Sequence, residues 1–338
     1  MNTKLSNNLT LFIIFIIVAG MFSIFLPSQF LTMINFASMG RQFPEYGLLS
    51  LANMLAMITG GIDLSVTSIT SLSGVMAASV LTRWQATSMP AGAIIVFGIL
   101  TALAVSAVCG ALNGALIAYI RVPAIIATLG TQGLFLGVSI IITKGHAIEN
   151  FPPPFLFIGN GDLGGIPMQF IIFIAAALVV GLLLTRTRYG FTMLMYGASP
   201  RVSRFSGVNN ERVLMSTYLT TGLLSGLASI IIISGVNSVR PGYGSDYLLL
   251  SVLIAVLGGT DPAGGFGTVL GLTLAIFIMQ ALQSGLNILA FSPFFKKFMW
   301  GLLLLLVMVF HYFRRRSAQT RAARKAAAER DRLATAQG

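Results

Sequence analysis

The sequence predicts an all-α polytopic membrane protein, and three observations support this prediction. Of the 338 residues, 56% are hydrophobic and only 9% are charged, whereas a soluble domain carries about 25% charged residues. The mean hydropathy is +0.88, and long apolar runs recur along the whole chain. This composition excludes a soluble enzyme domain, a nucleic-acid module and a disordered chain, and the single cysteine, Cys109, excludes a disulfide scaffold.

Ten apolar runs are long enough, or nearly long enough, to cross a membrane. The first has no small-residue cleavage site after it, so we interpret it as a retained span rather than a cleaved signal. We expect about ten transmembrane helices, some of them short or broken, in one domain over residues 1–313. A basic, polar tail follows over residues 314–338. The runs cover residues 9–27, 44–60, 64–82, 90–119, 122–143, 167–185, 213–235, 247–258, 264–290 and 298–313.

The distribution of Lys and Arg predicts the orientation of these spans. An even number of spans places both termini on one side of the membrane. With the N-terminus inside, the inner segments hold 15 of the 21 basic residues and the outer segments hold 6, as expected because cytoplasmic loops collect Lys and Arg. The tail supplies eight of the 15 and the loop over residues 186–212 supplies five. We therefore expect both termini and this loop in the cytoplasm, and the net charge of +12 needs no nucleic-acid partner.

Two places in the chain combine a short apolar run with glycines and an aspartate. The runs 47–60 and 247–258 are short, since twelve residues make about 18 Å of helix against a hydrocarbon core of ~30 Å. Broken spans at related places in two halves indicate the site or gate of a transporter, and the offset of 198 residues leaves an internal repeat open. Each aspartate either serves such a gate or caps the next helix. The two segments read Gly60-Gly61-Ile62-Asp63-Leu64-Ser65 and Gly258-Gly259-Thr260-Asp261-Pro262.

The residues needed for enzyme chemistry are largely missing. The dipeptide Gly-Lys does not occur, so the chain has no Walker A loop for nucleotide hydrolysis. The two histidines, His146 and His311, stand alone, and no metal-ligand spacing is present. The middle of nearly every predicted span lacks the ionisable group that an ion-coupled carrier normally needs. We expect no catalytic residue, metal or cofactor on this chain.

The loop over residues 186–212 contains a predicted short helix. Ser199 can cap a helix whose first residue is Pro200, and Gly207 fits its C-terminal stop. The predicted helix, 200–206, is amphipathic and basic, which suits docking into a groove of another protein. A solvated connection with orienting charges is the alternative interpretation.

Four segments together resemble the permease subunit of the ribose/galactose-type, or second carbohydrate-uptake, class of ATP-binding-cassette sugar importers. They occur in the family's order and at family-like spacing, and the resemblance covers about residues 45–313. The departures are Thr67, where the family usually has glycine, and Asp261, where many members have no acid. The segments are 60–65 as quoted above, Gly110-Ala111-Leu112-Asn113-Gly114 through Val122-Pro123 to Gly130, Thr187-Arg188-Tyr189-Gly190 through Gly207-Val208-Asn209, and Val256-Leu257-Gly258-Gly259-Thr260.

The resemblance implies a permease in a bacterial inner membrane that pairs with a second permease copy or homologue. It implies ATPase subunits on the inside, which carry ATP and Mg, and a periplasmic sugar-binding protein that delivers the substrate. In this family the segment matching residues 197–209 faces the ATPase. The resemblance therefore assigns ATPase docking to Gly197, Pro200, Arg201, Arg204, Phe205, Gly207 and Asn209.

A neutral sugar of ribose or galactose type needs an uncharged but polar pathway. Polar residues of the matching segments and their neighbours are candidates for it, although an interhelical hydrogen bond is the alternative role of each. Outer basic residues are candidates for contact with the binding protein, or with lipid headgroups. The gate and pathway candidates are Gly60, Gly61, Asp63, Ser65, Ser68, Asn113, Thr128, Thr131, Gln132, Gly258 and Gly259. The outer candidates are Arg41, Arg83, Arg240, Lys296 and Lys297.

Two other functions compete with a permease powered by a partner. One is a self-powered secondary carrier or channel for a small polar solute, and the other is a structural membrane scaffold. Uptake by the chain alone separates the first from the leading hypothesis. The identity of the sugar and the choice between a homodimer and a heterodimer stay open at this point.

Overall fold

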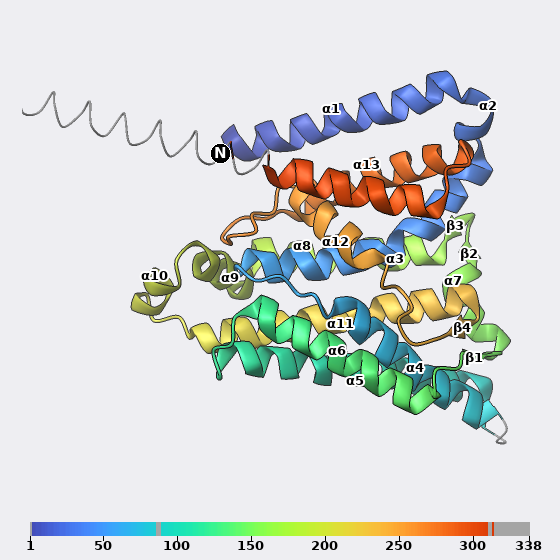
Figure 1. Ribbon diagram of the computed structural model, residues 1–338, viewed down its shortest axis with the longest axis horizontal. Helices are drawn as coiled ribbons and strands as arrows, with labels where there is room; N and C mark the ends of the chain where they lie inside the picture. Colours follow the sequence, from blue (N-terminus) through green and yellow to red (C-terminus); the bar gives the residue numbers. More distant parts are fainter. Residues whose placement is uncertain (1, 86–88, 310–312, 314–338) are drawn as a thin grey trace, which may run out of the picture.

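The computed structural model describes residues 2–85, 89–309 and 313, and the predicted tail over residues 314–338 lies outside them. The described chain is almost entirely helical (Figure 1). Its long helices are α1 (Asn2–Phe25), α3 (Met33–Ile58), α4 (Val66–Gln85), α5 (Ala91–Ala118), α6 (Ala124–Thr143), α8 (Met168–Arg186), α11 (Asn210–Val236) and α13 (Val269–Ile288). The shorter helices are α2 (Pro27–Phe30), α7 (Phe157–Asn160), α9 (Arg188–Ala198), α10 (Pro200–Phe205) and α12 (Tyr247–Leu257), with a 3₁₀ turn over Pro153–Leu156. Residues 293–309 are also helical.

Six of the described helices are long and apolar enough to cross a membrane. The chain is therefore helical and polytopic, as predicted. The strands are short and form two antiparallel pairs, β1 (Ile148–Glu149) with β4 (Ser238–Val239) and β2 (Asp162–Leu163) with β3 (Ile166–Pro167). The six helices are α1 from Asn8 onward, α5, α6, α8, α11 and α13.

The long helices α3 and α4 are not among these six, because both carry polar residues that lie inside the bundle. Every residue of α3 from Tyr46 to Ile58 is buried, and so are the Ser and Thr residues over 67–73 in α4. Two of these hydroxyls donate to backbone carbonyls one turn earlier, Thr70 to Val66 at 2.8 Å and Ser73 to Ile69 at 2.7 Å. A helix surrounded by protein needs no apolar surface toward lipid. Hydropathy alone therefore underestimates the ability of α3 and α4 to lie within a membrane.

The prediction of a short span over residues 44–60 is wrong. The helix α3 begins at Met33, where the Thr32 side chain accepts from the Asn35 N–H at 3.1 Å, and it continues through Pro44. Its 26 residues make about 39 Å of helix. The polar residues before Pro44 have partners, since Arg41 pairs with Asp162 at 2.7 Å, and the hydropathy pattern cannot foresee this. The second predicted short run is confirmed, because α12 has 11 residues.

Glycines allow α5 and α11 to pack with their backbones in contact. A Cβ atom on Gly110 of α5 would lie 2.4 Å from the Tyr218 carbonyl oxygen, and one on Gly222 of α11 would lie 2.4 Å from the Ser106 carbonyl oxygen. Small residues give such close approach between membrane helices. This contact brings polar residues of α5 and α11 to the segment between α3 and α4.

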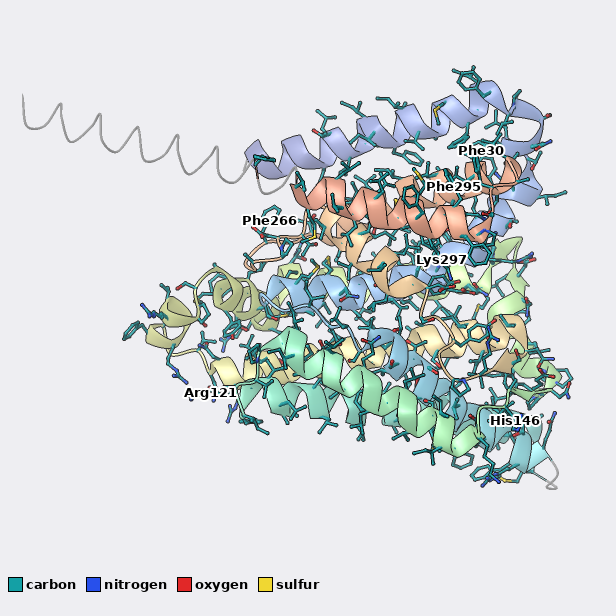
Figure 2. All side chains as sticks on the ribbon, in the orientation of Figure 1. Phe30, Arg121, His146, Phe266, Phe295 and Lys297 are labelled. Carbon is teal, nitrogen blue, oxygen red and sulfur yellow. The ribbon has the colours of Figure 1, made fainter. Side chains whose placement is uncertain are left out.

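The long helices run between two ends of the molecule (Figure 1). We call one the α10 end; it holds α9, α10, the start of α1, the end of the helix over residues 293–309 and the loop after α12. We call the other the β end, because it holds the two strand pairs, α2 and α7. Figure 2 places Arg121 and Phe266 at the α10 end and His146 at the β end.

Candidate functional site: a docking segment and two broken spans

The predicted short helix is present as α10; it begins at Pro200 as predicted and ends at Phe205, one residue before the predicted end. The Ser199 hydroxyl accepts from the Val202 N–H at 3.3 Å, and Pro200 occupies the first turn. The chain leaves the helix at Gly207, whose φ of +78° is one that glycine adopts readily. The structure adds one helix that the sequence analysis did not predict, α9, which Thr187 caps through the Gly190 N–H.

The outward face of α10 is apolar and basic. Phe205 is 92% exposed, and Arg201 is exposed beside it. Arg204 is also exposed, but it forms an ion pair with Glu211 at 2.5 Å. Such a surface pair contributes only ~0–1 kcal/mol, so it leaves the guanidinium available to a partner. An exposed aromatic ring on the same short helix as two exposed arginines suits docking onto another protein.

Asn210 fixes α10 to the start of α11. Its amide donates to the Pro200 carbonyl at 2.9 Å, and its side-chain oxygen accepts from the buried Ser203 hydroxyl at 2.8 Å. Asn209, predicted to dock, is exposed and caps α11 by accepting from the Arg212 N–H at 2.8 Å. Asn210 therefore ties α10 to the start of α11, and Asn209 caps α11 itself.

Gly197, at the end of α9, lies against both broken spans. A Cβ atom there would lie 1.8 Å from the Ile58 carbonyl oxygen and 2.4 Å from the Gly265 nitrogen. The Gly265 N–H also donates to the Ile58 carbonyl at 2.8 Å. The docking segment, the end of α3 and the loop after α12 thus meet at one point, and Gly197 faces the bundle rather than solvent.

The two breaks end their helices with the same backbone motif. After α3, the Gly60 N–H donates to Met57 and the Gly61 N–H donates to Ala56; after α12, Gly259 donates to Val256 and Thr260 donates to Ala255. Both sets are the Schellman pattern, and Gly60 and Gly259 have φ of +78° and +85°. The counterpart of Gly60 is therefore Gly259, at an offset of 199, and the predicted alignment of Gly60 with Gly258 is wrong by one residue.

Gly258 has a packing role instead. A Cβ atom on Gly258 would lie 2.7 Å from the Leu272 Cα atom, so this glycine lets α12 approach α13. Asp261 does not cap a helix, and that alternative is wrong for it. Its carboxylate accepts from the Ala263 N–H at 2.9 Å within the loop, whereas Thr268 caps α13.

Asp63 and three other predicted pathway residues form one connected set of hydrogen bonds, the Asp63 set, which also includes Thr221. The fully buried carboxylate accepts from the Ser65 hydroxyl at 2.6 Å and from the Ser65 N–H at 3.0 Å. Ser65 accepts from the Asn113 amide at 2.7 Å, and Asn113 accepts from the Thr131 hydroxyl at 2.7 Å. The second Asp63 oxygen accepts from Thr221 of α11 at 3.0 Å. Three helices are thereby tied to the unwound segment over residues 59–65.

Thr128 satisfies the backbone of the same segment. Its hydroxyl lies 3.1 Å from the Ile62 carbonyl, to which it donates, and accepts from the Leu64 N–H at 3.2 Å. Non-helical backbone within a membrane protein needs such partners because lipid supplies none. Ser68 is buried and Gln132 is half-buried, and neither takes part in these hydrogen bonds. The Asp63 set is thus buried within the chain rather than open to a solute.

A cavity of about 330 Å³ connects the first break with the docking segment. Burial, and then the negative charge of Glu211, raise the pKa of the Tyr196 hydroxyl in its wall, which keeps this group a neutral donor. Arg121, between α5 and α6, adopts a φ of +63° beside it. The walls include Thr59, Gly60, Gly61, Arg121, Pro123, Tyr196, Pro200, Arg204, Asn210, Glu211 and Tyr218.

The outer basic candidates differ in their partners. Arg41 pairs with Asp162 and Lys297 pairs with Asp246, each at 2.7 Å. Lys296 donates to the Asn287 side chain. Arg83 and Arg240 are exposed. Three of the five candidates therefore have partners within the chain, whereas Arg83 and Arg240 are exposed on its surface.

Sequence reasoning missed three residues of this region. Thr221 follows another threonine in an apolar run, and only its contact with Asp63 distinguishes it. Asn210 stands directly after a helix cap, a position that gives no signal. Glu45 falls at the start of the apolar run over residues 44–60, whereas it lies well inside α3. The partners of Thr221 and Glu45 are remote in sequence, at separations of 158 and 202 residues.

Comparison with known proteins agrees with this arrangement. A family described as "branched-chain amino acid transport system / permease component" matches residues 35–308. The ribose import permease protein RbsC of Bacillus subtilis is 33% identical over 303 residues, which cover 89% of this chain and 90% of that protein. The autoinducer 2 import system permease protein LsrD of Escherichia coli K12 is 33% identical over 247 residues, 71% of this chain and 72% of its own length. No solved structure matches the chain.

The family match covers most of the chain, and the relatives just named are both import permeases. The expected class is confirmed, and with it a multi-pass membrane protein that is not an enzyme. The chain belongs to the permease family of ATP-binding-cassette importers.

Proposed function

We propose that this chain forms the translocation pathway of a binding-protein-dependent importer for a neutral sugar of ribose type, in a bacterial inner membrane. The ribose import permease that matches 89% of the chain supports the substrate class. A separate ATPase, carrying ATP and Mg, supplies the energy, and a periplasmic sugar-binding protein delivers the solute. A second permease copy or homologue completes the pathway.

The topology in this proposal has ten crossings with both termini in the cytoplasm. The crossings are α1, α3, α4, α5, α6, α8, α11, α12, α13 and the helix over residues 293–309. The start of α1 and the end of the helix over residues 293–309 lie at the α10 end in Figure 1. Five arginines lie in the loop over residues 186–212 at that same end, which favours the cytoplasm for it.

In this proposal, motion of the ATPase reaches the spans through the contact at Gly197. The ATPase would bind Phe205, Arg201 and Arg204 on α10, and its closure would move α10 and α9 together. Because Gly197 touches Ile58 and Gly265 together, both broken spans would move at once. The Asp63 set would hold the first break in one of two positions. The exposed Arg83 and Arg240 would meet acidic residues of the binding protein.

Uptake by the reconstituted system tests this function. Liposomes with this chain, its ATPase and its binding protein should accumulate D-ribose only when ATP is present on the side of the membrane that carries the ATPase. Liposomes with this chain alone should accumulate none under a proton or sodium gradient. Gradient-driven uptake without the ATPase would instead establish the self-powered carrier.

A further inference from the structure

The length of α3 places Glu45 deep inside the bundle. Thirteen residues separate Glu45 from Ile58 at the α10 end of the helix, which is about 20 Å of helix against a hydrocarbon core of ~30 Å. Glu45 is half-buried, and it takes no part in the three ion pairs of the described residues. Its carboxylate accepts from the Tyr247 hydroxyl at 2.6 Å. An ionisable residue at this depth indicates function.

The segment over residues 240–246 reaches the same depth without forming a helix. It starts after β4 at the β end and stops where α12 begins. Because α12 has only 11 residues, or about 16 Å of helix, the segment must descend through the outer half of the membrane. It turns at Gly242 and Gly244, which have φ of +80° and +83°. The Gly242 N–H donates to the Ser71 hydroxyl of α4 at 2.9 Å.

This segment exposes polar groups that lipid cannot accommodate. Arg240, Ser245 and Asp246 are exposed. The ion pair between Asp246 and Lys297 measures 2.7 Å, and its side chains are 57% and 47% exposed. Irregular backbone at membrane depth occurs only where protein covers it or where it lines water. Since the described residues do not cover it, the segment is available to line a water-filled space.

Where the segment ends, Tyr247 at the start of α12 meets Glu45 through the hydrogen bond given above. Tyr243 lies four residues earlier in the segment, and both tyrosine side chains are half-buried. The ring of Tyr46 lies 5.9 Å from that of Tyr247, and its hydroxyl donates to the Gln280 side chain behind it. Glu45 and Tyr247 are therefore held together by a hydrogen bond, and Glu45, Tyr243 and Tyr247 each keep part of their surface exposed.

We propose that residues 240–246 line the outer half of the aqueous pathway and that Glu45, Tyr243 and Tyr247 bind the hydroxyl groups of a neutral polyol at its inner end. This inference rests on the proposed function. A carboxylate accepts several hydrogen bonds, and a tyrosine hydroxyl both donates and accepts. A polyol offers matching hydroxyls, and it carries no charge for Glu45 to repel, whereas an anionic solute would be repelled.

Thiol labelling tests the position of the pathway without knowledge of the solute. In membranes containing the complete transporter, Ser245→Cys should react with a positively charged methanethiosulfonate. Leu178→Cys is the matched control, because Leu178 is 63% exposed on the apolar helix α8 and should not react. Cys109 is buried and gives little background. An unreactive Ser245→Cys in an assembled transporter overturns the pathway.

Solute discrimination tests the role of Glu45. Glu45→Gln should lower the rate of D-ribose uptake by the complex about tenfold, which is the scale of one hydrogen bond to a charged group. The rate of 2-deoxy-D-ribose uptake should fall less, because this sugar offers one hydroxyl fewer. If Glu45→Gln lowers the uptake of both sugars equally, and Tyr247→Phe lowers it by the same factor, Glu45 only fixes α12 in place through Tyr247. That result would overturn the binding site. A wild-type complex that imports no ribose contradicts the proposed substrate class, while the labelling still decides where the pathway runs.

Discussion

The carboxylate of Asp63 is fully buried and takes its hydrogen bonds from Ser65 and Thr221, not from a base. A buried polar atom that loses its partner costs about 1–3 kcal/mol. The Asp63 set therefore stabilises one arrangement of the unwound segment over residues 59–65. Breaking these hydrogen bonds costs little free energy if a second arrangement of the segment offers Asp63 the same donors. This property suits a gate.

Removal of the Thr221 hydroxyl tests this at the residue scale. Thr221→Val keeps the side-chain volume but leaves one Asp63 oxygen without its donor, so the free energy of unfolding should fall by about 1–3 kcal/mol. Thermal unfolding of the purified protein in detergent measures the change. Thr101→Val is the control, since Thr101 donates only within its own helix, to Phe97 at 2.7 Å. Equal melting temperatures for both variants would contradict the role of Thr221.

Gly197 permits a second test at this scale. Gly197→Ala places a methyl group 1.8 Å from the Ile58 carbonyl oxygen, so the end of α9 must move away from both breaks. The complex should keep its basal ATPase activity, whereas its rate of ATP-driven uptake should fall at least about tenfold. A tenfold fall corresponds to ~1.4 kcal/mol in activation free energy. The control is Gly130→Ala, where no atom lies within 4 Å of the new Cβ. Unchanged uptake by Gly197→Ala would remove Gly197 from the transmission.

At the scale of elements, α10 is preformed rather than ordered by its partner. Ser199 and Pro200 start it, Gly207 ends it, and Asn210 fixes it to α11. A rigid docking helix loses little conformational entropy on binding. It can therefore transmit a displacement instead of absorbing it.

Charge reversal on α10 tests docking. In the double variant Arg201→Glu with Arg204→Glu, the ATPase should no longer co-purify, because two favourable contacts become repulsive. Membrane insertion should be unaffected, since both side chains are exposed. Arg83→Glu, at the far end of α4, serves as the control and should retain the ATPase. Normal co-purification of the double variant would count against docking at α10.

At the scale of the whole molecule, the docking segment and the strand pairs lie at opposite ends (Figure 1). In intact cells an impermeant thiol reagent should label His146→Cys, at the β end, and should label Ser206→Cys only after the membrane is permeabilised. Both positions are exposed. Labelling of Ser206→Cys in intact cells would invert the proposed orientation.

The sequence by itself determined the class of this protein and its local signals. Composition indicated a polytopic membrane protein, and Ser199, Pro200 and Gly207 predicted α10 because caps and stops act within a few residues. The glycine pairs correctly marked the two breaks, although the equivalence of Gly60 with Gly259 needed the backbone hydrogen bonds.

Only the tertiary structure decided the rest. Hydropathy reports contact with lipid, so it cut α3 short at Pro44 and hid Glu45, whose polar neighbours find partners inside the protein. The Asp63 set joins residues up to 158 positions apart, and Gly197 is confined by Ile58 and Gly265 from two other elements. Hydrogen bonds and close contacts of this kind depend on which helices pack together, and a local pattern carries no record of that packing.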